Sequence, residues 1–222
     1  MNTLAEISAR SGRDLRAGTL RRADLEAFGA ILDEHGGGTL LITGAGDGPL
    51  ALSTGLASAA TARGIPTALL ECDLSSPALA DALGLEHGPG LREYLLEEAQ
   101  AAEILQPLVL AGPASAAATG PLICIVAGEA GLDGPRAGDP EGFRHALAKL
   151  RHAYELVVLH GPPLGDESGV LREAAEGADS VLACVGAALA SGRAGRKLAK
   201  ALRRLPAPAA GVVVYGRAGQ SA

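Results

Sequence analysis

The segment 38–51 reads GTLLITGAGDGPLA, and the expected fold follows from it. Its residues 39–42 are four aliphatic or β-branched residues in a row, which predicts a short buried strand. Three glycines come next within five residues, and they allow backbone angles that other side chains forbid: Gly44, Gly46 and Gly48. Pro49 then stands in the first turn of an alanine- and leucine-rich helix, where its missing N–H has no helical partner to lose.

A strand, a glycine loop and a helix in this order have the geometry of a phosphate cradle, in which loop amides and the helix N-terminus face an anion. The two side chains that such a loop uses in catalysis are absent, because Gly46-Asp47-Gly48 is followed by Pro49 and Leu50. Two interpretations of the glycines stay open. They form either a surviving anion-binding nest or a tight strand-to-helix turn that folding requires.

The composition favours a single α/β domain over residues 19–222, preceded by a polar, flexible arm over residues 1–18. Hydrophobic residues make up 48% of the chain and aromatic residues 2%, so we expect an aliphatic core, as in a parallel sheet with helices on both faces. The net charge of −6 argues against nucleic acid or anionic lipid as a partner of the whole surface, and it leaves room for local basic patches.

Neither a signal peptide nor a membrane-spanning segment is visible, so we expect a cytoplasmic protein without a transmembrane segment of its own. The three cysteines each lie in an apolar run, at spacings that match no metal motif: Cys72, Cys124 and Cys184. We expect buried, reduced thiols and no metal site.

Strand and helix patterns alternate along the chain. We expect strands at 39–42, 65–72, 122–126, 155–159, 180–185 and 210–215, and helices at 19–35, 49–63, 78–83, 90–98, 139–152, 168–176 and 190–205. Ser76 is the expected N-cap of the helix at 78–83. This alternation predicts a doubly wound, mostly parallel sheet.

Three further stretches carry a resemblance to a known family: LLECDLSSP at 69–77, GLEHGPGLREYL at 84–95 and YELVVLHGPP at 154–163. Together with the glycine loop, they resemble the bacterial tyrosine kinases of capsule and exopolysaccharide synthesis. These are P-loop proteins related to the ParA and MinD ATPases. The resemblance runs from about residue 26 to residue 216. It implies a P-loop NTPase type of fold and a place at the inner face of the membrane, bound to a membrane chain-length determinant (polysaccharide co-polymerase).

The departures from this family fall on its catalytic positions. Where the family has Gly-Glu-Gly-Lys-Ser/Thr, Pro49 replaces the lysine that binds the β/γ-phosphates, and Leu50 replaces the hydroxyl that binds Mg²⁺. Where the family has Asp-x-Asp-x-Arg, the chain has Glu71, Asp73 and Ser75. The acidic residue that ends the fourth strand is replaced as well, and the sequence therefore predicts a pseudokinase with no catalytic residues.

Several consequences follow from the resemblance. We expect no cofactor, with ATP and Mg²⁺ binding only if the degenerate loop still holds them. The family's ring-forming Glu-x-x-Arg-x-x-Arg motif is reduced to Glu26, with Gly29 and Leu32 in place of the arginines, and this leaves a homo-oligomer an open question. The tyrosine-rich tail of the family is missing too. We expect no nucleic-acid partner.

Each acidic-motif equivalent has two interpretations. Glu71 is either a cation contact or a polar residue at the rim of the sheet, and Asp73 is either the remnant of a metal site or a loop carboxylate near Ser76. His160 ends a strand at the sheet edge where α/β proteins bind ligands, and the alternative is a hydrogen-bonded structural histidine.

Two other functions compete with the pseudokinase. One is an active tyrosine kinase or ATPase with displaced catalytic groups. The other is a dinucleotide-binding oxidoreductase, in which Gly44-Ala45-Gly46 follows a strand and Glu71 holds the ribose hydroxyls. The helix at 190–205 is strongly basic, and its cations form either a solvated face or a patch for an acidic partner segment.

Overall fold

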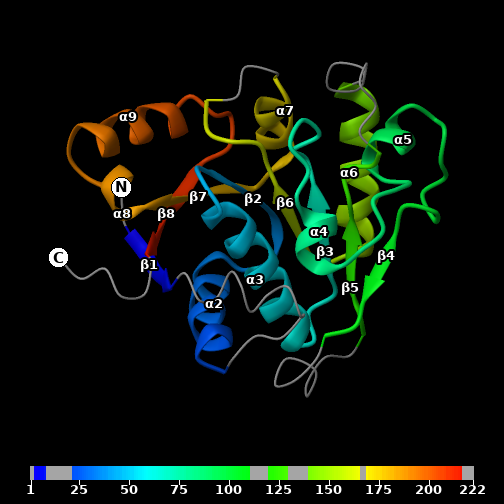
Figure 1. The fold of residues 1–222 in the computed structure, drawn as a ribbon, viewed down its shortest axis with the longest axis horizontal. Helices are drawn as coiled ribbons and strands as arrows, with labels where there is room; N and C mark the ends of the chain where they lie inside the picture. Colours follow the sequence, from blue (N-terminus) through cyan, green and yellow to red (C-terminus); the bar gives the residue numbers. More distant parts are fainter. Residues whose placement is uncertain (1–2, 9–21, 111–119, 130–139, 166–168, 217–222) are drawn as a thin grey trace.

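The computed structural model describes residues 3–8, 22–110, 120–129, 140–165 and 169–216 (Figure 1). The strands are β1 (Thr3–Ser8), β2 (Gly38–Gly44), β3 (Thr67–Glu71), β4 (Gln106–Leu108), β5 (Leu122–Ile125), β6 (Leu156–His160), β7 (Ser180–Gly186) and β8 (Ala209–Gly216). The helices are α2 (Arg22–His35), α3 (Gly48–Ala62), α4 (Leu79–Leu83), α5 (Leu91–Leu95), α6 (Pro140–Ala153), α7 (Val170–Gly177), α8 (Ala187–Ala190) and α9 (Gly192–Leu202).

Within the described ranges the strands form one eight-stranded sheet in the order β1-β8-β7-β2-β6-β3-β5-β4. Neighbouring strands run parallel except at the β4–β5 pair, which is antiparallel. The fold class predicted from the alternating pattern is therefore confirmed. The order has one consequence for the site: β6 lies between β2 and β3, so the strand that precedes the glycine loop does not pair with the next strand of the chain.

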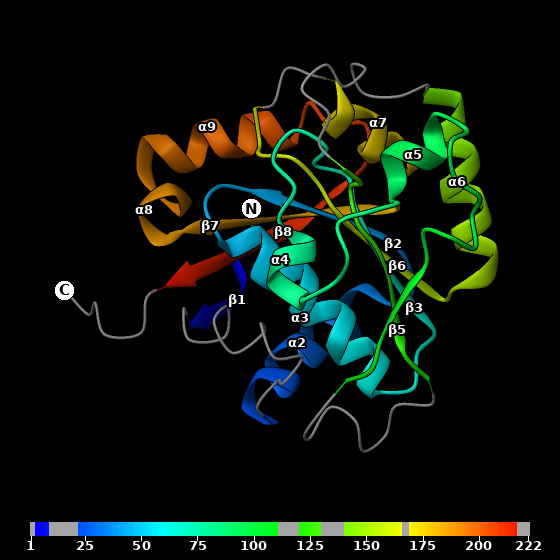
Figure 2. The same ribbon diagram turned by 45° about the vertical axis from the view of Figure 1, so that its right-hand side comes forward.

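Helices cover both faces of the sheet, and each face has its own apolar cluster (Figures 1 and 2). The helices α2, α3 and α4 pack on one face, while α5, α6, α7 and α9 pack on the other. The contact between α2 and α3 is close at Gly55, where an added Cβ would lie 2.2 Å from the ring of Phe28. Thirteen of the fifteen residues of α3 are buried, so this helix forms part of the core beside the glycine loop.

The prediction of a flexible arm is wrong for residues 3–8, because β1 pairs in parallel with β8 at the edge of the sheet. The rest of the predicted arm, and the predicted start of the first helix at 19–21, lie outside the described residues. The short antiparallel strand β4 was not predicted either. Both are edge strands, whose pairing depends on distant segments rather than on a strong local pattern.

Two local predictions at helix ends are also corrected. The basic helix is not continuous over 190–205: α8 ends at Ala190, and Gly192, with a φ of +61°, begins α9. The N-cap of α4 is Ala78 rather than Ser76, and Ala78 has no side chain that can accept a hydrogen bond from the helix. The acceptor comes instead from Glu71 on β3.

Candidate functional site: the carboxyl edge of the central strands

Three central strands end side by side at the carboxyl edge of the sheet. Ile42 of β2 is in register with His160 of β6, which is in register with Glu71 of β3. The glycine loop follows β2, and its residues Ala45 to Asp47 are exposed. In open α/β sheets this edge is where ligands bind, so the structure brings the predicted site residues to the expected place.

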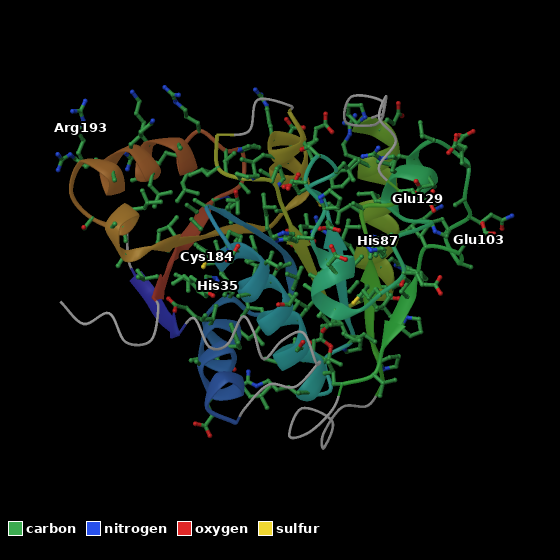
Figure 3. All side chains as sticks on the ribbon, viewed as in Figure 1. His35, His87, Glu103, Glu129, Cys184 and Arg193 are labelled. Atoms are coloured by element: carbon green, nitrogen blue, oxygen red, sulfur yellow. The ribbon has the colours of Figure 1, made fainter. Side chains whose placement is uncertain are left out.

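The packing of the loop explains two of its three glycines. A Cβ on Gly44, whose φ is +153°, would lie 1.9 Å from the carbonyl oxygen of Cys184. A Cβ on Gly48 would lie 2.8 Å from the Sγ of Cys184 and 3.1 Å from the Cβ of Tyr215. Figure 3 shows Cys184 inside the fold. The interpretation of a tight strand-to-helix turn is therefore supported for Gly44 and Gly48, because each touches β7.

Gly46 differs from the other two, because nothing lies within 4 Å of a Cβ added to it and its φ is +71°. The turn requires a glycine at this position only because the backbone there is left-handed. Within the described ranges, four backbone N–H groups of the loop and first helical turn have no protein acceptor: those of Gly46, Asp47, Gly48 and Leu50. The amide part of an anion nest is therefore retained, while Pro49 contributes no donor.

The two positions after the glycines are part of the protein interior. Pro49 is buried, and its carbonyl oxygen accepts a hydrogen bond from the Oγ of Ser53 at 2.9 Å. Leu50 packs against the apolar cluster on the α3 face. The first turn of α3 thus offers neither an ammonium group nor a hydroxyl at the positions where a P-loop kinase would hold phosphate and Mg²⁺.

Glu71 is neither a rim residue nor free to contact a cation. Its side chain is fully buried, and its Oε1 accepts hydrogen bonds from the backbone N–H groups of Ala78 at 2.6 Å and Leu79 at 2.9 Å. Its Oε2 accepts a third hydrogen bond from the N–H of Ala127 at 3.2 Å. Burial raises the pKa of this carboxyl above its usual value, against the effect of the three donors. Glu71 therefore caps α4 and ties it to the segment that follows β5.

Asp73 is a loop carboxylate. It is 6% exposed, and its Oδ1 accepts hydrogen bonds from the backbone N–H and the hydroxyl of Ser75 and from the N–H of Ser76, at 3.0–3.2 Å. This is the hydrogen-bond pattern of an Asx turn, which orders the chain between β3 and α4. The second interpretation of Asp73, as a local structural residue, is thus supported.

His160 is a buried, hydrogen-bonded residue, 7% exposed. Its Nδ1 shares a hydrogen bond of 3.2 Å with the Oγ of Ser53, one turn into α3. Burial lowers the pKa of the imidazole to about 4, although the negative charge of Asp73 acts in the opposite direction. The imidazole is therefore neutral at pH 7, in the place where the resembling kinases carry a carboxylate. Sequence reasoning missed Ser53, whose only signal was its spacing of four residues from Pro49.

At this edge, Pro49, Leu50 and His160 supply no cation for a phosphate, and the carboxylate of Glu71 is already bound to backbone N–H groups. Among the described residues, no group of three or more His, Cys, Asp or Glu side chains is arranged to hold a metal ion. The three cysteines are free and buried, and burial raises the pKa of each thiol. In the same described ranges, no helix is both long and apolar enough to cross a membrane.

The topology argues against the dinucleotide-binding alternative. In that fold the strand that precedes the glycine loop pairs with the strand that follows the first helix, whose acidic residue binds the ribose. Here β6 separates β2 from β3, and the carboxylate of Glu71 is already bonded to three backbone N–H groups. The position that would recognise a ribose is therefore occupied by internal contacts.

No protein family model and no curated protein sequence matches the chain. Solved structures do match it. The chimerical protein CapA2B2 aligns with a TM-score of 0.78 at 17% identity, covering 98% of this chain and 95% of that one. The kinase domain of the Escherichia coli tyrosine kinase ETK aligns with a TM-score of 0.74 at 16% identity, covering 100% and 92%.

The septum site-determining protein MinD from Pyrococcus horikoshii, complexed with Mg-ADP, aligns with a TM-score of 0.60 at 16% identity, covering 82% of this chain and 71% of that one. The likeness at these identities is one of fold. The chain has the MinD-like P-loop fold of bacterial tyrosine kinase domains, as the sequence motifs predicted, over nearly its whole length.

Proposed function

We propose that this chain is a catalytically inactive protein with the fold of the bacterial tyrosine kinases, which acts as a regulator or scaffold in capsule or exopolysaccharide synthesis and export. One observation carries the proposal. At the carboxyl edge of the sheet, each position that would handle a Mg²⁺–triphosphate in such a kinase holds either a neutral group or a carboxylate bound to backbone N–H groups.

The proposed loss of catalysis has an electrostatic reason. Phosphoryl transfer depends on cations placed against a polyanion, and little else in the protein accelerates it. Pro49 and Leu50 bring no charge to the loop, and His160 is neutral at pH 7. The exposed Asp47 stands where the family loop carries a glutamate, so it adds no cation to the loop either.

The partner in this proposal is the cytoplasmic end of a membrane chain-length determinant, the protein that the resembling kinases bind. The intact fold supports it, because a P-loop domain with neutral catalytic positions still offers its outer surfaces for binding. The chain would then lie at the inner face of the membrane through this partner. We expect the complex to form equally well with and without ATP and Mg²⁺.

Co-purification tests the proposal. The tagged full chain is expressed in its own host, and the proteins retained after extraction of the membranes with detergent are identified. Recovery of a chain-length determinant, unchanged by added nucleotide, is the expected result. Recovery of other complexes without any protein of the polysaccharide apparatus would overturn the assignment to this pathway.

One observation favours a second candidate, a protein that binds nucleotide without hydrolysing it. The four unpaired N–H groups of the loop are the donors that a phosphate would use. The same observation is the best support for the alternative of an active kinase with displaced groups. Direct nucleotide titration and a hydrolysis assay distinguish the three possibilities.

A further inference from the structure

Charge is divided unevenly along the chain. Residues 180–222 contain seven basic residues and no acidic residue, whereas residues 1–179 contain 12 basic residues and all 25 acidic ones. A protein with a net charge of −6 thus combines a segment of +7 with a segment of −13. The positive charge of the protein is thus concentrated in its C-terminal segment.

Six of the seven cations form one surface, here called the basic face, on α9 and the turn that follows it: Arg193, Arg196, Lys197, Lys200, Arg203 and Arg204. All six are exposed, and α9 buries the opposite side through Gly195, Leu198 and Leu202. On an ideal helix the six lie within an arc of about 120° and along about 17 Å of the axis. Figure 3 shows Arg193 pointing away from the body of the protein.

The basic face has no ion-pair partner among the residues that the structure describes. In the part of the chain that the structure describes, none of its six side chains makes an ion pair or a hydrogen bond. Other surface arginines do have acidic partners. Arg63 pairs with Asp33 at 2.7 Å, and Arg151 pairs with Asp179 at 3.0 Å. Six like charges on one helix and the turn that follows it repel one another, so contact with an external anionic surface would be favoured there.

We propose that the basic face binds directly to a membrane surface that carries anionic lipid headgroups. A convex helix face with its cations spread over several turns suits a plane of headgroups, since clusters of four to eight Lys or Arg on an amphipathic helix are typical of anionic-lipid binding.

This inference goes beyond the proposed function, because it requires no protein partner. Co-sedimentation with protein-free vesicles therefore tests it separately from the co-purification described above. The full chain is mixed with vesicles of phosphatidylglycerol and phosphatidylcholine in equal parts, or with vesicles of phosphatidylcholine alone. Binding to the anionic vesicles only, with a steep loss as salt rises from about 0.05 M to about 0.3 M, is the expected result.

A pair of matched variants locates the contact. Arg196→Gln/Lys197→Gln/Lys200→Gln removes three charges from the basic face, and we expect at least a tenfold loss of partitioning onto anionic vesicles, at about 1 kcal/mol for each cation near the surface. Arg144→Gln/Lys149→Gln/Arg172→Gln removes three exposed charges from α6 and α7, and we expect less than a twofold loss. Circular dichroism and thermal melts establish that both variants fold.

Arg193→Lys/Arg196→Lys/Arg203→Lys keeps every charge and is expected to bind as the wild type does. Equal losses in the two glutamine variants, or equal binding to both kinds of vesicle, would overturn the proposal. Binding to polyglutamate or DNA, with no binding to either kind of vesicle, would also overturn the proposal. It would assign the basic face to an acidic protein or to nucleic acid.

Discussion

The Nδ1 of His160 and the Oγ of Ser53 lie 3.2 Å apart, and this buried hydrogen bond joins the end of β6 to the second turn of α3. In the kinases that the chain resembles, the same strand end carries a carboxylate beside the phosphate-binding helix. Here a neutral imidazole and a hydroxyl bond to each other. At this edge, where other α/β proteins bind ligands, the two side chains are therefore used for internal packing.

This pair predicts a pH dependence of stability. The pKa of His160 is lowered to about 4 in the folded protein, from 6.5 for an unperturbed histidine. Between these values the unfolded chain binds the proton more readily, so stability is full above pH 6.5 and falls as the pH drops toward 4. The loss attributable to His160 is about 3 kcal/mol. Urea unfolding at a series of pH values measures it.

His160→Asn should remove this component, because the amide does not titrate. His152→Gln, on the exposed face of α6, is the control and should follow the wild-type pH curve. Parallel curves for wild type and His160→Asn would contradict the assignment.

Replacing Glu71 should lower the stability of the fold, because its carboxylate is a structural hydrogen-bond acceptor. Glu71→Ala leaves the N–H groups of Ala78, Leu79 and Ala127 without their acceptor, and we expect a loss of about 2–4 kcal/mol in the free energy of unfolding. The exposed Glu86→Gln should change it by less than about 0.5 kcal/mol. If Glu71→Ala were as stable as the wild type, the capping role would be excluded.

The glycine loop predicts a contrast between neighbouring positions. Gly44→Ala places a Cβ 1.9 Å from a backbone carbonyl oxygen, and relief of that clash requires β2 and β7 to separate. We expect it to destabilise the fold by about 3 kcal/mol or more. Gly46→Ala meets no atom and carries only the left-handed backbone strain of about 1–2 kcal/mol. Thermal or urea unfolding of the two variants side by side gives the comparison, and equal losses would argue against the packing described here.

Introducing the lysine and the hydroxyl of a P-loop kinase after the glycine loop should not produce catalysis. Pro49→Lys/Leu50→Ser returns the cation and the hydroxyl of a P-loop kinase. The carboxylate of Glu71 nevertheless stays on its three N–H donors, and His160 remains neutral. We expect detectable nucleotide binding and no phosphate release above that of a protein-free blank. Mg²⁺-dependent turnover by this variant would mean that Glu71 and Asp73 suffice to hold the metal.

The sequence predicted the central architecture because the central strands are continuous apolar runs. Segments such as Leu156–His160 are short apolar runs that contain β-branched residues, which favours buried strands over helices, and glycines and prolines mark the loops between such elements. The edge strands were missed for the opposite reason. Thr3–Ser8 has a mixed pattern and pairs with a strand some 200 residues away, and β4 has only three residues, one of them a proline.

The positions of the site residues were predictable, and their contacts were not. A residue that ends a parallel strand must lie at the carboxyl edge of the sheet, so Glu71 and His160 were placed correctly. Whether a carboxylate there faces solvent or accepts backbone hydrogen bonds depends on where α4 begins. The sequence indicated Ser76 as the cap of that helix, whereas the structure begins it after Ala78, which has no capping side chain, so the need for Glu71 could not be predicted.

Calorimetric titration of the full chain with ADP and ATP, each with and without Mg²⁺, tests most directly whether the Mg²⁺–nucleotide site of the resembling kinases has been lost. We predict no heat of binding and no thermal stabilisation at millimolar nucleotide. A micromolar, Mg²⁺-dependent affinity would contradict this. It would also stabilise the fold by about 4 kcal/mol at millimolar ligand, a shift that a thermal melt detects readily.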